Sequence, residues 1–225
     1  NYGYVWEGFY TEEEIAQVEA GELPSPPNVT VQPGDMRYKD LNGDGIIDKA
    51  DQKVIGYPPQ PQISGGINGS VSFKGFDLSF GLQGAAQVSR NITYIYQDPF
   101  GPADGHGVLQ THVNYAWTPE RAADGSVKWP RHSFANDEFN NRMSTFWNRN
   151  SSYLRLKRAE LGYTLSGDAL QRIGMQKVRI YVRGTNLYTL THDEFTMVDP
   201  ERQPGQHSMQ HPLMKNFIGG LSLSF

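Results

Sequence analysis

The chain has 225 residues, of which 37% are hydrophobic, and a formal net charge of -4 at pH 7. This charge provides no basic stripe, so nucleic acid is not expected as a partner, and the lack of cysteine excludes disulfides and thiolate metal sites. No run approaches 18 apolar residues, which excludes a transmembrane helix but not a transmembrane β-barrel, whose apolar signal falls on every second residue. The first residues, Asn1 to Gly3, carry no leader pattern, so for an exported protein we expect the leader upstream.

Residues 1–62 contain one clear helical signal and no strand pattern of useful length. Thr11 is followed three residues later by Glu14, the spacing of a capping box, so a short helix is predicted to begin there and to end near Gly21. Prolines 24, 26 and 27 then exclude a helix from the next segment. We expect this region to be a loop region built around an Asp-rich stretch.

Strict alternation of apolar and small or polar residues begins at Ile63 and resumes after Lys74-Gly75. Two such runs separated by two residues, one of them glycine, predict a β-hairpin. Its apolar face holds Ile63, Ile67, Val71, Phe73, Phe76, Leu78, Phe80 and Leu82. The opposite face consists of small polar residues and glycines, which cannot form a packed core and is expected to border water.

Three further strands are predicted at 152–165, 178–190 and 216–225. In the first of these the apolar phase slips at Lys157 and Arg158, which indicates either a β-bulge or the point where the strand leaves its apolar surroundings. The final strand alternates Phe217, Leu221, Leu223 and Phe225 with Ile218, Gly220, Ser222 and Ser224 on the other side.

The connections between the predicted strands alternate in length. Residues 89–151 and 191–215 are long, whereas the turns at 74–75 and 166–177 are short. In an up-and-down antiparallel sheet all long connections then gather at one end, as in outer-membrane barrels with short periplasmic turns and long external loops. The fold predicted is all-β, with 1–62 as an external loop region and 63–225 as five barrel strands.

The Asp-rich stretch 40–51 has the spacing of a calcium-binding loop. Positions 1, 3, 5, 7, 9 and 12 are occupied by Asp40, Asn42, Asp44, the Ile46 carbonyl, Asp48 and Asp51, and Gly45 stands at the sharp turn. Asp51 is shorter than the usual glutamate, which affects bidentate closure. The alternative is a surface loop of Asx-turns without an ion.

The long connection 89–151 carries aromatic residues with two interpretations. Trp117, Trp129, Tyr94 and Tyr96 could stack on sugar rings or contact a partner protein; Pro119 and Pro130 would hold the two tryptophans rigidly. Alternatively these rings pack the connection onto itself or form an interfacial girdle.

Several segments in order resemble the carboxyl end of SusC/RagA-type TonB-dependent outer-membrane transporters. These segments are Pro33 to Gly45, Lys74 to Leu78, Ser152 to Leu165 and Val178 to Leu187, and the terminal Phe225 resembles the aromatic end of a barrel-assembly signal. The resemblance implies a plugged barrel in the cell outer membrane that imports oligosaccharides or peptides. It also implies a SusD-like lipoprotein partner, and TonB contacts made by an amino-terminal part that this chain lacks.

A different class of protein is also compatible with parts of this sequence. A soluble β-sandwich that binds carbohydrate and contains calcium would explain the Asp-rich loop and the tryptophans, but not the long loops gathered at one end. An enzyme is not expected, because no paired carboxylates can be placed on the predicted strands as a glycosidase would need.

Overall fold

The structure is a computed structural model that describes residues 1–92, 96–97, 99–100, 108–133, 137–192, 199–201 and 213–225. Its contacts divide the chain into two compact units. One unit contains residues 59–88 and the described parts of 151–202 and 211–225; it is called the sheet unit below. The other contains Asn1–Pro58 and the described parts of Ser89–Asn150, and is called the aromatic unit. The division at residue 62 that the sequence suggested stays a prediction.

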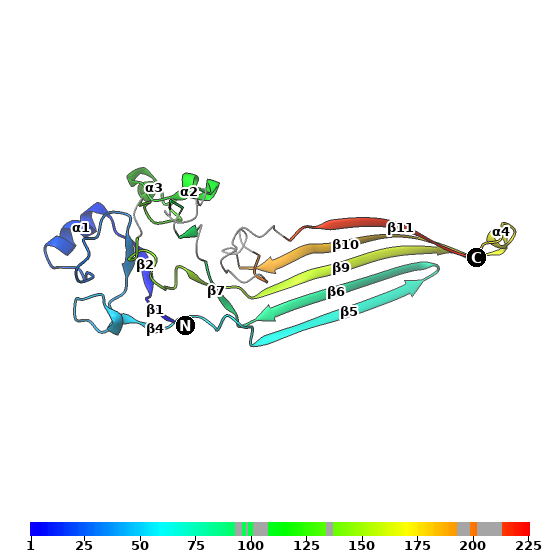
Figure 1. Ribbon diagram of the computed structural model, residues 1–225, viewed down its shortest axis with the longest axis horizontal. Helices are drawn as coiled ribbons and strands as arrows, with labels where there is room; N and C mark the ends of the chain where they lie inside the picture. Colours follow the sequence, from blue (N-terminus) through cyan, green and yellow to red (C-terminus); the bar gives the residue numbers. More distant parts are fainter. Residues whose placement is uncertain (93–95, 98, 101–107, 134–136, 193–198, 202–212) are drawn as a thin grey trace. The chain divides into compact units, whose positions relative to one another are not determined.

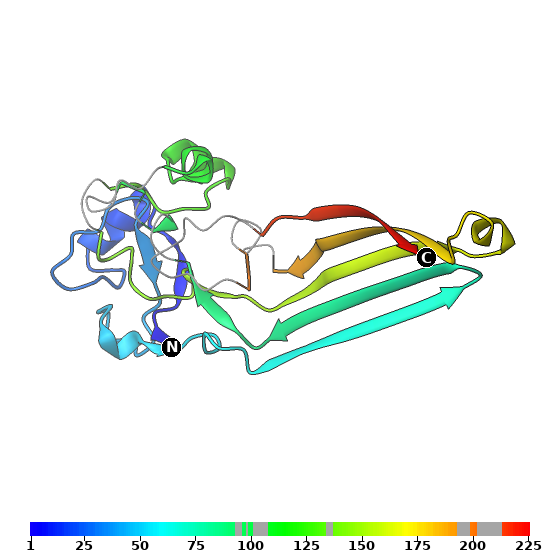
Figure 2. The ribbon, with the colours of Figure 1, turned by 45° about the vertical axis from the view of Figure 1, so that its right-hand side comes forward.

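The sheet unit is built on five antiparallel strands that neighbour one another in chain order (Figure 1). Figure 2 shows the same strands side by side from a second direction. Because each strand pairs with the next one along the chain, this is the up-and-down order expected from the sequence. The strands are β5 (Ile63–Phe73), β6 (Phe76–Ala86), β9 (Tyr153–Leu165), β10 (Lys177–Thr191) and β11 (Asn216–Ser224).

The turns at one end of the sheet are short. Lys74 and Gly75 join β5 to β6 with positive φ angles of 48° and 86°, as a two-residue hairpin turn requires. The helix α4 (Asp168–Gln171) lies in the connection from β9 to β10. The connections 87–152 and 192–215 both leave and return at the other end, so the predicted asymmetry of the sheet is confirmed.

The two faces of the sheet differ completely in character. The register places Val71 opposite Leu78, Leu78 opposite Leu161, and Leu161 opposite Val182, so apolar side chains of neighbouring strands form continuous rows. Within the sheet unit no described residue forms a second layer over this face, and Phe217 and Val71 remain 73% and 61% exposed. A sandwich would have buried these rows against a second sheet.

The phase slip in β9 is a β-bulge, the first of the two interpretations of the sequence. On the β6 side, Gly81 pairs with Arg158 and Leu82 pairs with Leu156, so Lys157 is the extra residue. On the other side the pairing jumps from Thr185 to Tyr188 of β10, and Asn186 there has a positive φ of 52°. Two adjacent strands are therefore bulged at one level.

The aromatic unit contains short elements that the sequence did not reveal. The expectation of no strand before residue 63 is wrong, because β1 (Tyr2–Gly3) pairs with β4 (Lys53–Val54) and β2 (Trp6–Phe9) pairs with β3 (Met36–Tyr38). Strands of two to four residues are too short to show a period. The remaining elements are η1 (Lys49–Asp51), β7 (Ser89–Asn91), α2 (Gln110–Tyr115), α3 (Pro119–Asp124) and β8 (Asn148–Asn150).

The predicted helix is present as α1 (Glu12–Glu19), with the full capping box between Thr11 and Glu14. None of the helices in the described part of the chain is both long and apolar enough to cross a membrane.

The core of the aromatic unit joins its first 58 residues to the connection 89–150. Trp147 and Met36 are completely buried, and the Tyr38 hydroxyl donates a hydrogen bond to the Phe139 carbonyl at 3.0 Å. The buried Asp35 carboxylate accepts hydrogen bonds from Arg131 and Asn140. The long connection therefore contributes to a packed core, which distinguishes it from an unstructured loop.

Candidate functional site

The polar face of the sheet carries a line of ion pairs across three strands. Arg179 of β10 donates hydrogen bonds to Asp77 of β6 and to Glu160 of β9, and Arg183 donates a second bond to Glu160. Gly162 lies beneath this cluster, where an added Cβ would stand 2.5 Å from the Arg179 guanidinium. The alternation therefore places charge on this face and keeps it off the other.

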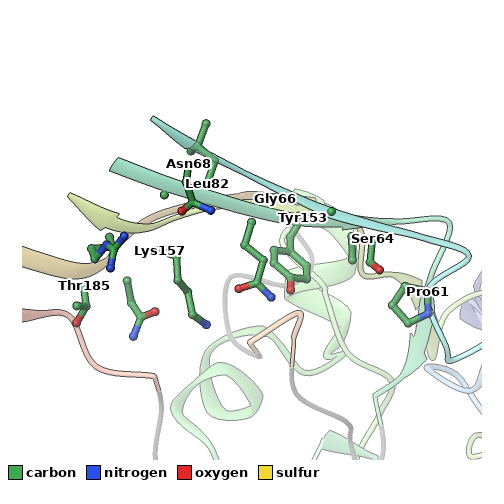
Figure 3. A pocket seen from close by; sticks show the side chains of 15 residues that line it. Pro61, Ser64, Gly66, Asn68, Leu82, Tyr153, Lys157 and Thr185 are labelled. Carbon is green, nitrogen blue, oxygen red and sulfur yellow. The ribbon is translucent and has the colours of Figure 1, made fainter. Parts of the chain in front are cut away.

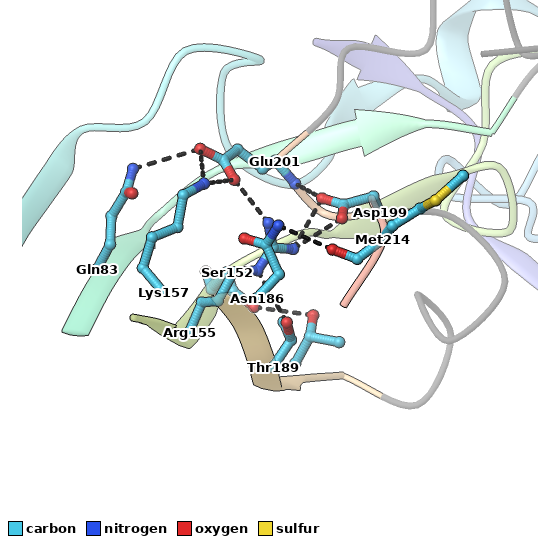
Figure 4. Close-up of polar contacts among 10 residues, drawn as sticks. Gln83, Ser152, Arg155, Lys157, Asn186, Thr189, Asp199, Glu201 and Met214 are labelled. Carbon is cyan, nitrogen blue, oxygen red and sulfur yellow. Dashed lines mark hydrogen bonds and ion pairs between the residues drawn. The ribbon is translucent and has the colours of Figure 1, made fainter. Parts of the chain in front are cut away.

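A second polar cluster lies where β9 begins, at the end of the sheet with the long connections (Figure 4). Arg155 is 2% exposed. Its Nη2 donates to both Asp199 carboxylate oxygens, at 2.9 and 2.8 Å, its Nη1 donates to Glu201 at 2.7 Å, and its Nε donates to Thr189. These charge-assisted bonds hold residues 199–201 against the polar face.

A hollow of about 790 Å³ opens on the polar face near the same end (Figure 3). Its walls come from β5, β6, β9 and β10, and glycines leave its floor without side chains. A Cβ at Gly66 would stand 2.9 Å from the Leu82 carbonyl oxygen, and one at Gly81 would stand 2.8 Å from Asn68 Oδ1. Its volume is in the range of small-molecule sites.

The Asp-rich loop lies in the aromatic unit, between β3 and β4. Asp40 accepts hydrogen bonds from the backbone N–H groups of Gly43 and Gly45, and the Gly45 bond chiefly lowers the pKa of Asp40. Asp44 likewise accepts from Ile46 N at 2.8 Å. These are the Asx-turns that either interpretation of the loop requires.

The remaining acidic side chains of this loop test how well it fits a calcium ion. Asp51 is buried, and its two oxygens accept hydrogen bonds from Leu41 N and Asp48 N at 2.7 and 2.9 Å. Asp48 caps η1 through Ala50 N. In this conformation no three acidic or histidine side chains among the described residues converge on one point. The donor set is all oxygen, as calcium prefers, but Asp51 is engaged with the backbone.

The aromatic residues proposed for contact have different surroundings. Trp129 is buried, stacks on Tyr96 and on Trp147 at centroid distances of 6.0 and 6.1 Å, and donates from Nε1 to Thr111 Oγ1. This geometry favours the alternative in which the connection packs onto itself. Trp117 is half-buried, and its ring lies against Gly34, whose Cβ would be 2.6 Å away. Tyr94 lies outside the described residues.

Two histidines that the sequence did not single out lie together in the aromatic unit. The rings of His112 and His132 are 5.5 Å apart, beside an enclosed cavity of about 20 Å³. His112 is 1% exposed, and neither of its ring nitrogens has a hydrogen-bond partner among the described residues. Burial lowers its pKa to about 4. A lone histidine in a polar connection gives no sequence signal for this environment.

Comparison with known proteins finds relatives along the whole chain. "TonB-dependent receptor P3" of Formosa agariphila is 28% identical over 239 residues, covering 100% of this chain and 22% of the relative. "TonB-dependent receptor SusC" of Bacteroides thetaiotaomicron is 25% identical over 227 residues, covering 99% of this chain and 20% of the relative. No protein-family model matches the chain.

The solved structures that match share the fold. "Structure of the RagAB peptide transporter" matches with a TM-score of 0.65 and 20% identity, covering 100% of this chain and 22% of that chain. The chain thus spans about a fifth of the length of the relatives it matches. The resemblance to the carboxyl-terminal part of SusC/RagA-type TonB-dependent receptors is confirmed, as is the all-β barrel fold.

Proposed function

We propose that this chain forms the last five barrel strands of a TonB-dependent outer-membrane receptor that imports oligosaccharides or peptides. The observation that carries this proposal is the single-layer sheet, with continuous apolar rows on one face and ion pairs on the other. Such a face is stable in lipid, because a closed barrel satisfies its backbone internally and turns its apolar side outward.

The dimensions of the apolar face support a bilayer as its neighbour. From Leu154 to Leu165, β9 advances about 36 Å at about 3.3 Å per residue. With a strand tilt of 35–45°, this length corresponds to about 26–30 Å along the membrane normal, close to the thickness of the apolar band of outer-membrane barrels. Phe73, Phe76 and Tyr163 lie in neighbouring register at the hairpin end, where an aromatic girdle is expected.

The same proposal includes two protein partners of the receptor and a calcium ion. The end of the sheet with the long connections faces the cell exterior, where a SusD-like surface lipoprotein would dock, while TonB would contact a part of the receptor outside this chain. Ca²⁺ would bind the Asp-rich loop through Asp40, Asn42, Asp44, Asp48 and the Ile46 carbonyl. Asp51 would close the loop after leaving the Leu41 and Asp48 N–H groups that it binds in this structure. The ion would brace this external loop.

The soluble carbohydrate-binding sandwich remains the alternative, but the fold gives it no support. A sandwich needs a second sheet against the apolar rows, and the described residues of the sheet unit provide none.

The experiment is fractionation and uptake with the full-length receptor in cells. We expect the receptor in the outer membrane as a heat-modifiable band, and uptake of a labelled oligosaccharide or peptide that stops when TonB is depleted. Recovery of the protein in the soluble fraction, or uptake that does not respond to TonB depletion, would overturn the proposal.

A further inference from the structure

The hollow on the polar face of the sheet unit has a strongly one-sided charge. Among the described residues that line it, Lys157 and Arg158 are cationic and none carries a carboxylate. Both belong to the bulge in β9, where the extra residue brings two consecutive long cations to one level of the sheet. Arg158 is exposed, and no hydrogen bond or ion pair of its guanidinium is found among the described residues. This corner therefore presents an unneutralised positive charge.

A carboxylate of the chain itself already occupies the edge of this corner. Glu201 accepts a hydrogen bond from Lys157 Nζ at 3.1 Å and another from Gln83 Nε2 at 3.3 Å, and both donors line the hollow. Arg155 holds Glu201 from behind at 2.7 Å (Figure 4). The geometry shows how a carboxylate is recognised there, by an ammonium and a side-chain amide together.

The rest of the lining suits a ligand rich in hydroxyl groups. Asn68, Gln83 and Asn186 provide amides, each of which can donate and accept. Asn186 is held at the bulge of β10 with a positive φ and donates to the Met214 carbonyl at 3.1 Å. Its Oδ1 is buried, so this amide would meet a ligand as a donor through Nδ2. Tyr153 adds an aromatic ring to the wall (Figure 3).

We infer that this hollow binds an acidic oligosaccharide, with a ligand carboxylate or sulfate at Arg158 and Lys157 and ligand hydroxyls at the three amides. The inference rests on the proposed function and names the substrate class of the receptor. A peptide fits less well, because the Glu201 carboxylate at the edge of the hollow is already bound by Lys157 and Arg155 and is not available to an amino terminus. Another segment of the receptor is the competing occupant, and the experiment distinguishes it.

The test uses the full-length receptor in detergent and two probes of equal length, a galacturonic acid hexamer and its methyl-esterified form. We expect Arg158→Gln to weaken binding of the acidic probe by about tenfold, the worth of one charge-assisted hydrogen bond. Glu201→Gln should strengthen that binding several-fold, because Glu201 no longer repels the probe or competes for Lys157. Lys74→Gln, which removes the same charge at the hairpin turn, should change nothing.

Equal effects of Arg158→Gln and Lys74→Gln, or no preference for the acidic probe, would overturn the inference. A loss of thermal stability in Arg158→Gln without any change in probe binding would assign the hollow to another segment of the receptor instead. TonB-dependent uptake is measured in the same strains. If the proposed function is wrong, no variant takes up substrate in a TonB-dependent way. If only this inference is wrong, uptake persists while the acidic probe shows no preference.

Discussion

Arginine placed at different depths of β6 tests directly whether lipid covers the apolar face. Phe76 lies at the hairpin end of the strand and Phe80 near its middle, about 3 Å along the strand from the midpoint between Phe76 and Ala86 at about 3.3 Å per residue. Ser79 precedes Phe80 on the opposite face. We compare Arg and Ala variants at each position, because the difference removes the cost of losing the aromatic ring.

The expected difference depends on depth. A lipid-facing arginine near the bilayer midplane costs about 2–4 kcal/mol, and one near the interface costs about 0–1 kcal/mol. Phe80→Arg should therefore be less stable than Phe80→Ala by about 2–4 kcal/mol, or roughly 30- to 700-fold in the unfolding equilibrium. Phe76→Arg should lie within about 1 kcal/mol of Phe76→Ala. Ser79→Arg should be tolerated, since it lies opposite Glu160 on the polar face.

The assay is urea-dependent folding of the full-length receptor into phospholipid vesicles, followed by the shift of the folded band on gels. A protein core would reject arginine at Phe76 and Phe80 alike. Equal Arg-to-Ala differences at both positions, or a larger cost at Ser79, would therefore refute the idea that a bilayer covers this face.

Three further predictions concern the aromatic unit. Asp35→Ala should destabilise it by about 3 kcal/mol, because Arg131 loses the buried carboxylate that it binds; hydrogen exchange of the 129–133 backbone measures this, and unchanged protection would contradict it. Burial lowers the pKa of His112 to about 4 from about 6.5 in the unfolded chain. The free energy of unfolding of the aromatic unit should therefore be constant above pH 6.5 and fall, by at most about 3 kcal/mol, as the pH decreases to 4. His112→Phe should remove this pH dependence from the hydrogen-exchange protection. Calorimetry should detect calcium binding that Asp40→Asn abolishes and Asp168→Asn preserves; no heat at millimolar calcium would remove the site.

The sheet could be predicted from the sequence because its signal is local and repeated. Alternation identified the five strands and their apolar rows, and the slip at Lys157 identified the bulge, since a side-chain period of two leaves no other way to keep Leu154 and Leu161 on one face. The helix at Thr11 was equally local, because its cap lies within one turn.

The aromatic unit could not be derived in the same way, because its contacts join distant segments. The motif Pro33 to Tyr38 supported the family resemblance, but the sequence did not show which contacts these residues make. In the structure, Gly34 lies against Trp117, Asp35 binds Arg131, and Met36 and Tyr38 are buried. Asp35 and Arg131 are 96 positions apart and Tyr38 and Phe139 are 101 apart, and no local pattern around these residues predicts the contacts. The same reason hid the burial of Trp129 and the ion pairs of Arg155 with Asp199 and Glu201.

The extra residue at Lys157 determines which side chains at the start of β9 lie on the polar face and which lie on the apolar face. If one residue were deleted there, Tyr153 to Leu156 would shift by one step, and because side chains alternate, all four would exchange sides. Leu154 and Leu156 would then point into the aqueous interior of the proposed barrel, and Arg155 would point toward hydrocarbon without its two acids. A deletion of one residue would thus turn Tyr153 to Leu156 inside out, whereas a substitution of Lys157 would preserve the parity.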